Sequence, residues 1–171
     1  MKSRSQSLAD EHAVKLELAA EVLTSSGRLR LGVTGWSMLP AVWPGDTLTI
    51  ESANSEAVSD GDIVLFRRDG RFFVHRVLGK IVKNSTILTR GDAMLQPDPP
   101  VANRDLLGKV VFILREGRRI RPRRNLSFSS RAVSAAVRRS DIAARVVVGV
   151  HGRLQKLFVQ NSNHRASACQ N

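Results

Sequence analysis

Apolar and polar residues alternate along several short runs of this chain, which is the pattern of half-buried β-strands. The clearest run, residues 71–78, follows another strand-like run, and Asp69-Gly70 between them is a strong hairpin signal. The sequence predicts strands over 47–50, 62–66, 71–78, 86–90 and 109–114. We therefore expect a mainly β domain.

A helical period replaces the alternation near both ends of the chain. Residues 8–23 predict a short amphipathic helix, in which Ser7 with Asp10 resembles a capping box. Residues 130–158 predict a basic amphipathic helix, with a break near the glycines at 149 and 152, and residues 159–171 are expected to be disordered. The expected organisation is an N-terminal helix over 1–27, a β domain over 28–125, and a basic helix and tail over 126–171.

One stretch of the chain suggests chemistry. Gly35-Trp36-Ser37-Met38-Leu39-Pro40 leads within a few residues to Gly45-Asp46 and a strand, an arrangement that holds a hydroxyl at the edge of a sheet. A serine needs a base within hydrogen-bonding reach to act as a nucleophile. The alternation over 71–78 puts His75 on one face with Phe73, and because both faces are largely apolar, we expect His75 to be at least half buried.

A carboxylate that could orient this histidine follows the strand at 86–90. Asp98 lies among prolines in Gln96-Pro97-Asp98-Pro99-Pro100, and a loop stiffened in this way can aim a side chain. Asp92, in the nearer Gly91-Asp92 step, is a second carboxylate.

Each of these residues also has a purely structural interpretation. Ser37 could simply close a turn, His75 could be a core histidine, and Asp98 could be solvated. Gly-Asp occurs at 45–46, 61–62 and 91–92, beside strand-like runs, so its default meaning is a turn. Met38, with Leu39 and Trp43, belongs either to the core or to the wall of a substrate groove, and the sequence does not separate these two.

The motifs taken together resemble the type I signal peptidases. The residues that carry the resemblance are Gly-x-Ser-Met-x-Pro-x-x-x-x-Gly-Asp, then Val-His-Arg-Val, then Leu-Thr-Arg-Gly-Asp with a further aspartate six residues on. The match is to the branch of the endoplasmic reticulum, archaea and some bacteria, which uses serine, histidine and aspartate. The larger bacterial branch and the related self-cleaving repressors have lysine where this chain has His75. The resemblance covers roughly residues 30–114 and implies a β domain of two small antiparallel sheets or a distorted barrel.

The resemblance also implies roles for individual residues. Ser37 would be the nucleophile, His75 the general base and Asp98 the acid that orients it. The supporting positions would be Asp92, Gly35, Met38 and Pro40, and the substrate groove would include Trp36, Met38 and Phe73. A bulky Trp36 stands where the family often has a small residue, which would narrow specificity. The family cleaves peptides after small residues, and it implies neither a metal nor an organic cofactor.

The N-terminal region departs from the family. Signal peptidases usually carry a transmembrane helix before the serine, and no window here approaches the roughly 20 apolar residues that spanning requires. No hydrophobic region of a cleaved signal peptide is visible either. We therefore expect a cytoplasmic or peripheral membrane protein. Its expected substrate is a precursor or leader peptide, and an exported protein is the alternative that the sequence leaves open. The single cysteine, Cys169, does not decide the redox compartment.

The positive charge of the chain leaves membranes and nucleic acids open as further binding partners. The net charge of +12 includes an arginine-rich run over 115–124, expected as the exit from the last strand. The basic helix over 130–158 suits the surface of an anionic membrane, or it packs on its own domain with a solvated basic face. Nucleic-acid binding ranks below proteolysis because no zinc spacing, single-strand platform or helix-turn-helix is visible. A catalytically silent peptide-binding β module is the other alternative.

Overall fold

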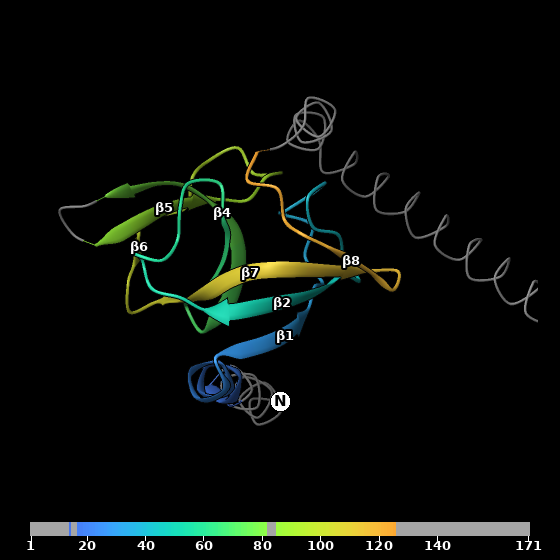
Figure 1. Cartoon of the computed structure of the whole chain (residues 1–171). Helices are drawn as coiled ribbons and strands as arrows, with labels where there is room; N and C mark the ends of the chain where they lie inside the picture. The colour runs from blue at the N-terminus through green and yellow to red at the C-terminus, as the bar shows by residue number, and fades with distance from the viewer. Residues whose placement is uncertain (1–13, 15–16, 82–84, 126–171) are drawn as a thin grey trace, which may run out of the picture.

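Eight strands of the described chain form one continuous antiparallel sheet (Figure 1). The computed structural model describes residue 14 and residues 17–81 and 85–125, and the basic helix predicted over 130–158 lies outside them. The strands are β1 (Arg28–Gly32), β2 (Thr47–Ser52), β3 (Ile63–Arg68), β4 (Arg71–Ile81), β5 (Thr86–Arg90), β6 (Val101–Ala102), β7 (Leu106–Arg115) and β8 (Arg118–Ile120). Their order is β1-β2-β7-β3-β4-β5-β6, with β8 paired to β7. The predicted mainly β class is confirmed, and the strands form one sheet.

Two tight hairpins have the same backbone conformation at their turns. Asp69 and Gly70, between β3 and β4, both have positive φ angles, as do Glu116 and Gly117 between β7 and β8. Two such residues in a row match the right-handed twist of the strands they join. The first hairpin is the one predicted. The second corrects the expectation for the arginine-rich run, because residues 118–120 are not an exit from the last strand but a strand paired back onto β7.

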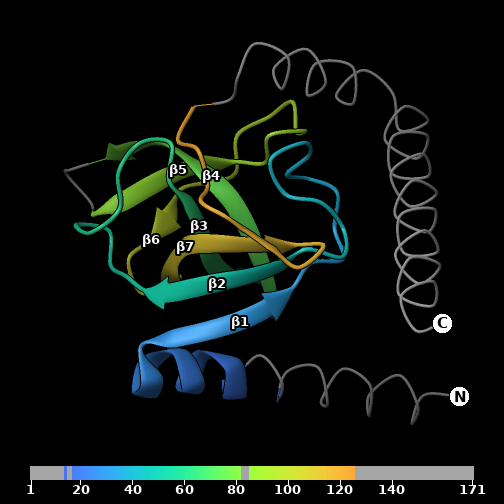
Figure 2. The same ribbon diagram turned by 45° about the vertical axis from the view of Figure 1, so that its right-hand side comes forward.

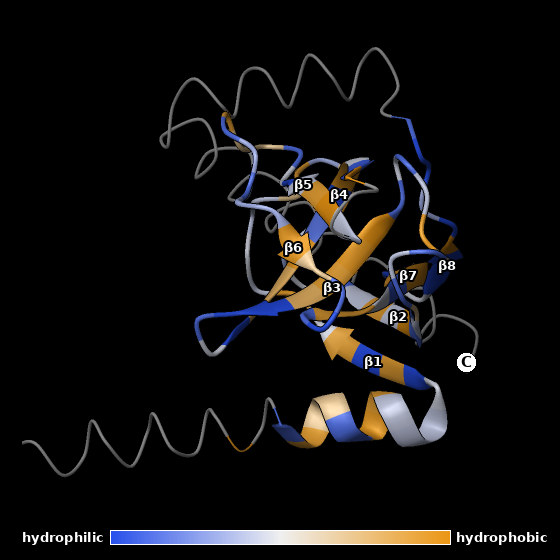
Figure 3. Cartoon of the chain, turned by 90° about the vertical axis from the view of Figure 1, so that its left-hand side faces the viewer, coloured by the Kyte–Doolittle hydropathy of each residue, from blue (hydrophilic) through white to orange (hydrophobic). Residues whose placement is uncertain are grey.

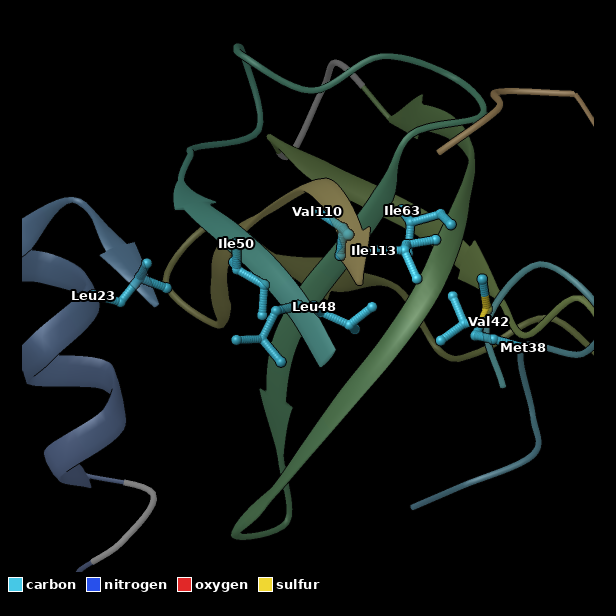
Figure 4. Close-up of a cluster of buried hydrophobic side chains, with 9 residues drawn as sticks. Leu23, Met38, Val42, Leu48, Ile50, Ile63, Val110 and Ile113 are labelled. Carbon is cyan, nitrogen blue, oxygen red and sulfur yellow. The ribbon is translucent and has the colours of Figure 1, made fainter. Parts of the chain in front are cut away.

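The N-terminal helix packs against β1, as Figure 2 shows. Residues 17–26 are helical, so the helix ends three residues beyond the predicted position, and Gly27 with φ of 70° makes the turn into β1. Leu23 is 1% exposed and belongs to the cluster of buried residues shown in Figure 4. Truncating such a leucine to alanine typically costs about 2–5 kcal/mol, so this contact fixes the helix on the domain.

The core is divided between two clusters. The first contains Leu23, Met38, Val42, Leu48, Ile50, Ile63, Leu65, Val110 and Ile113. The second contains Val58, Val64, Phe66, Val77, Ile87, Val101 and Leu106. β3 contributes to both, because its residues are buried on both faces until Arg67 and Arg68, the polar end visible in Figure 3. β4 lies beside β3 and carries His75 against the second cluster.

Candidate active site

Ser37 begins a turn between β1 and β2 that the core holds in place. The amide of Leu39 donates to the Trp36 carbonyl at 3.1 Å, and the amide of Val42 donates to the Met38 carbonyl at 3.0 Å. The side chains of Met38, Leu39 and Val42 are all buried. Because these apolar residues anchor the turn, the partly buried Ser37 is presented at a fixed place rather than on a free loop.

His75 lies in β4 and is 5% exposed, which confirms the expectation that it is at least half buried. Its ring is 5.9 Å from those of Phe66 and Phe73, which stack on each other at 5.6 Å. The predicted sharing of one face by Phe73 and His75 is also observed. The two phenyl rings limit the directions in which the imidazole can turn.

Asp98 lies in the connection between β5 and β6 and is tied to Thr89 of β5. The Asp98 amide donates to the Thr89 carbonyl at 2.8 Å, and the Thr89 hydroxyl donates to Oδ2 of Asp98 at 2.7 Å. This pair of bonds pins both the backbone and the carboxylate. The proline-flanked loop thus brings Asp98 beside His75 of β4.

The structure brings Ser37, His75 and Asp98 into one hydrogen-bonded row. Nδ1 of His75 is 2.7 Å from Oδ2 of Asp98, and Nε2 is 3.1 Å from Oγ of Ser37. A carboxylate only accepts hydrogen bonds, so Nδ1 carries the proton and donates to Asp98. In the neutral imidazole Nε2 is then an acceptor, and it faces the Ser37 hydroxyl. This is the tautomer that a general base requires.

The environment of Asp98 favours its ionised form. Burial raises the pKa of the carboxyl, but the hydrogen bonds from His75 and Thr89, together with the charges of His75 and Arg68, outweigh it and leave the pKa below the ordinary value. An ionised Asp98 can stabilise the imidazolium that forms when His75 accepts a proton.

Asp92 is held by a different partner. Its two carboxylate oxygens accept hydrogen bonds from Nε and Nη2 of Arg76 at 2.8 and 2.7 Å, with both side chains buried. Nη1 of Arg76 donates to the carbonyls of Gly61 and Arg123 at 2.7 Å and to that of Arg124 at 3.2 Å. Arg76 therefore ties the Gly91-Asp92 turn to the segment that follows β8.

Gly91 has a part in the site that the sequence did not reveal. A Cβ atom at this position would lie 2.7 Å from the Ser37 carbonyl oxygen and 3.1 Å from Nε2 of His75. The next residues reinforce the approach, since the Ala93 amide donates to the same carbonyl at 2.8 Å. From the sequence, Gly91 is expected only as part of a turn. No spacing signal marks such a close contact between segments far apart in the chain.

The remaining predicted positions lie in different surroundings. Trp36 is 39% exposed beside Ser37, and Phe73 is partly buried against the second cluster. Met38 is 3% exposed and belongs to the first cluster, so its side chain is part of the core. The Pro40 carbonyl accepts a hydrogen bond from the Trp43 indole at 2.8 Å. A Cβ atom on Gly35 would meet nothing within 4 Å, so packing does not require glycine there.

The other two Gly-Asp steps follow the pattern of Asp92. Asp46 is buried and pairs with Arg115, and Asp62 is buried and pairs with Arg124. Two arginines of the basic run therefore serve internal ion pairs. Within residues 17–81 and 85–125 no cluster of three or more metal-ligating side chains is found, and no helix there is long and apolar enough to cross a bilayer.

A comparison with protein-family models identifies a family for this chain. Residues 2–111 match the family model described as Peptidase S24-like. This span covers most of the chain and includes Ser37, His75 and Asp98, together with the strands that carry or flank them. A comparison with curated proteins found no significant match. The extent of the family match and the mainly β architecture agree, and the chain belongs to the Peptidase S24-like family.

Proposed function

We propose that this chain is a serine endopeptidase in which Ser37 is the nucleophile, His75 the general base and Asp98 the orienting acid. The observation that carries the proposal is the continuous row from Ser37 Oγ through the imidazole to Asp98 Oδ2, with distances of 3.1 and 2.7 Å. Family membership supports a peptidase in general. The row supplies the residues that peptide hydrolysis needs.

The chemistry follows from the tautomer of His75. Nε2 takes the Ser37 proton as Oγ attacks a peptide carbonyl, and the same proton then passes to the departing amine when the C–N bond breaks. A water molecule then attacks the ester carbonyl of the acyl-enzyme while Nε2 takes a proton from it. Nε2 returns this proton to Ser37 Oγ as the bond between Oγ and the acyl carbon breaks. The Ser37 amide is the proposed oxyanion donor, since a preorganised donor at the developing charge is a large contribution to catalysis.

The proposed branch is that of the signal peptidases with a histidine base. The support is His75 itself, in the position where the self-cleaving repressors and most bacterial signal peptidases have lysine. The substrate class proposed on this basis is a precursor or leader peptide cleaved after a small residue. The exposed indole of Trp36, adjacent to the nucleophile, is placed to restrict the residues accepted there.

A peptide library tests this function. Purified protein is incubated with a mixture of synthetic peptides that vary at the residues around one bond, and the products are identified by mass spectrometry. Cleavage after small residues that is lost in both Ser37→Ala and His75→Ala supports the proposal. Peptides that bind Ser37→Ala and wild-type protein equally, with no product from either, would indicate the silent peptide-binding module instead.

A further inference from the structure

Arg68 lies at the end of β3, close to the loop that carries Asp98. Its Nη2 donates hydrogen bonds to the carbonyls of Pro99 and Pro100, at 2.7 and 3.3 Å. These are the two residues directly after Asp98. Arg68 is only partly exposed, and its charge is one of the influences that lower the pKa of Asp98.

Arg68 also lies on the same face of the sheet as His75 and the two phenyl rings beside it. Val64 pairs with His75 across β3 and β4, Phe66 pairs with Phe73, and Arg68 pairs with Arg71. Alternate residues share a face of a sheet, so His75, the two phenyl rings and Arg68 follow one another on the same side. The guanidinium carbon of Arg68 is 5.2 Å from the centre of the Phe66 ring, and that ring packs edge-on against His75.

The loop after Asp98 depends on an outside donor. Prolines have no backbone N–H, so Pro99 and Pro100 cannot donate hydrogen bonds that would fix their own backbone. Only their carbonyls are available, and Nη2 of Arg68, which carries two N–H donors, binds both of these adjacent acceptors. The Thr89 carbonyl holds the loop on the near side of Asp98, and Arg68 holds it on the far side.

We propose that Arg68 is a positioning residue for the His75–Asp98 pair: by binding the carbonyls of Pro99 and Pro100 it keeps the Asp98 carboxylate on Nδ1 of His75. The effect on turnover rests on the proposed peptidase function. The effect on the hydrogen bond between His75 and Asp98 does not, and it is measurable without a substrate.

The kinetic test compares two arginines of one hairpin. Arg68→Gln should lower kcat by about 10- to 100-fold, as small displacements of a reacting group do, with KM changed less than about twofold. Arg71→Gln is the matched control, because Arg71 is directly opposite Arg68 and exposed, and its side chain has no hydrogen bond or ion pair within the described residues. It should retain wild-type kcat. Arg68→Lys should recover much of the loss, since an ammonium donates to a carbonyl and keeps the charge.

The spectroscopic test follows the Nδ1 proton of His75 by NMR in the full-length protein. In the wild type and in Arg71→Gln this proton should resonate far downfield, as expected for a bond to a carboxylate. In Arg68→Gln it should move upfield or broaden. If the proton moves as expected while even the wild type cleaves no peptide, the positioning role holds and the peptidase function fails. An unchanged resonance in Arg68→Gln, with kcat unchanged or lowered only in step with the melting temperature, would overturn the inference.

Discussion

Arg76 donates hydrogen bonds to both carboxylate oxygens of Asp92 in a buried ion pair. Asp92 is the aspartate that precedes Asp98 in the chain. His75 and Arg76 are adjacent in β4, so their side chains point to opposite faces and reach different carboxylates. His75 bonds Asp98, and Arg76 bonds Asp92. The alternation of one strand thus separates the pair proposed for catalysis from the ion pair of Arg76 and Asp92.

The two aspartates should respond differently to amide substitution. Asp98→Asn should lower kcat by up to about 10⁴-fold with little change in melting temperature, because an amide does not hold the histidine tautomer. Asp92→Asn should instead lower stability by about 3–5 kcal/mol, because the charge of Arg76 is left buried without its partner. Peptide cleavage and thermal unfolding of both variants measure this. A folded, inactive Asp92→Asn beside a fully active Asp98→Asn would reverse the assignment.

The lowered pKa of Asp98 predicts how stability depends on pH. A carboxyl whose pKa is lower in the folded state favours folding when it is ionised, and this contribution is fully present above the ordinary value of 3.8. It is lost as the pH falls through the lowered folded-state pKa. From pH 5 towards pH 2 the wild type should therefore lose more unfolding free energy than Asp98→Asn does, so the difference between the two should change with pH. Urea unfolding at a series of pH values measures it, and a constant difference would contradict the ionised state proposed for Asp98.

Gly91→Ala should impair turnover through a steric effect. The added methyl group would lie 2.7 Å from the Ser37 carbonyl oxygen and from Cγ of Met94, so the turn carrying Ser37 has to shift. We expect kcat to fall by about tenfold or more. Gly32→Ala is the control, since a Cβ atom there meets nothing within 4 Å. Equal activity of the two variants would show that the approach of Gly91 to Ser37 does not matter for turnover.

The segment after β8 should contribute to stability through Gly61. A Cβ atom on Gly61 would lie 2.5 Å from the Arg124 carbonyl oxygen, and the residue has a φ of 85°. Gly70→Ala is the matched control because Gly70 also has a positive φ, 64°, but open space around it. Both variants should lose about 1–2 kcal/mol from backbone strain, and Gly61→Ala should lose more. Thermal unfolding that ranks Gly70→Ala as the less stable variant would contradict the packing of Arg124 on Gly61.

Local patterns predicted the parts of this fold that local chemistry decides. Alternation located most of the strands and placed His75 with Phe73, and Asp69-Gly70 indicated its hairpin. The same reasoning missed β1, β6 and β8. In β8 the charged residues over 118–120 concealed a strand that pairs with β7 through the Glu116-Gly117 turn. All three residues of β8 are exposed, so they show no alternation of buried and exposed positions, and the turn was the only available signal for this strand.

The long-range contacts of the site could not be predicted from the sequence. Met38 adjoins Ser37 in a motif, and only the folded chain shows that its side chain is buried in the core. Gly91 and Arg68 lie far along the chain from the groups they contact, at Ser37 and Pro99. Neither contact leaves a periodic pattern, because each depends on how β3, β4 and the loop after β5 are brought together.

The most direct test of the central claim is the cleavage rate of a peptide substrate by wild-type protein and by Ser37→Ala. The substitution removes one hydroxyl oxygen from a partly buried position, so the fold and the melting temperature should be nearly unchanged. Ser52→Ala, at an exposed serine in β2, controls for loss of a hydroxyl elsewhere. We predict that Ser52→Ala cleaves like the wild type and that Ser37→Ala yields no product above background. Cleavage by purified Ser37→Ala at the wild-type rate would contradict the assignment of Ser37 as the nucleophile.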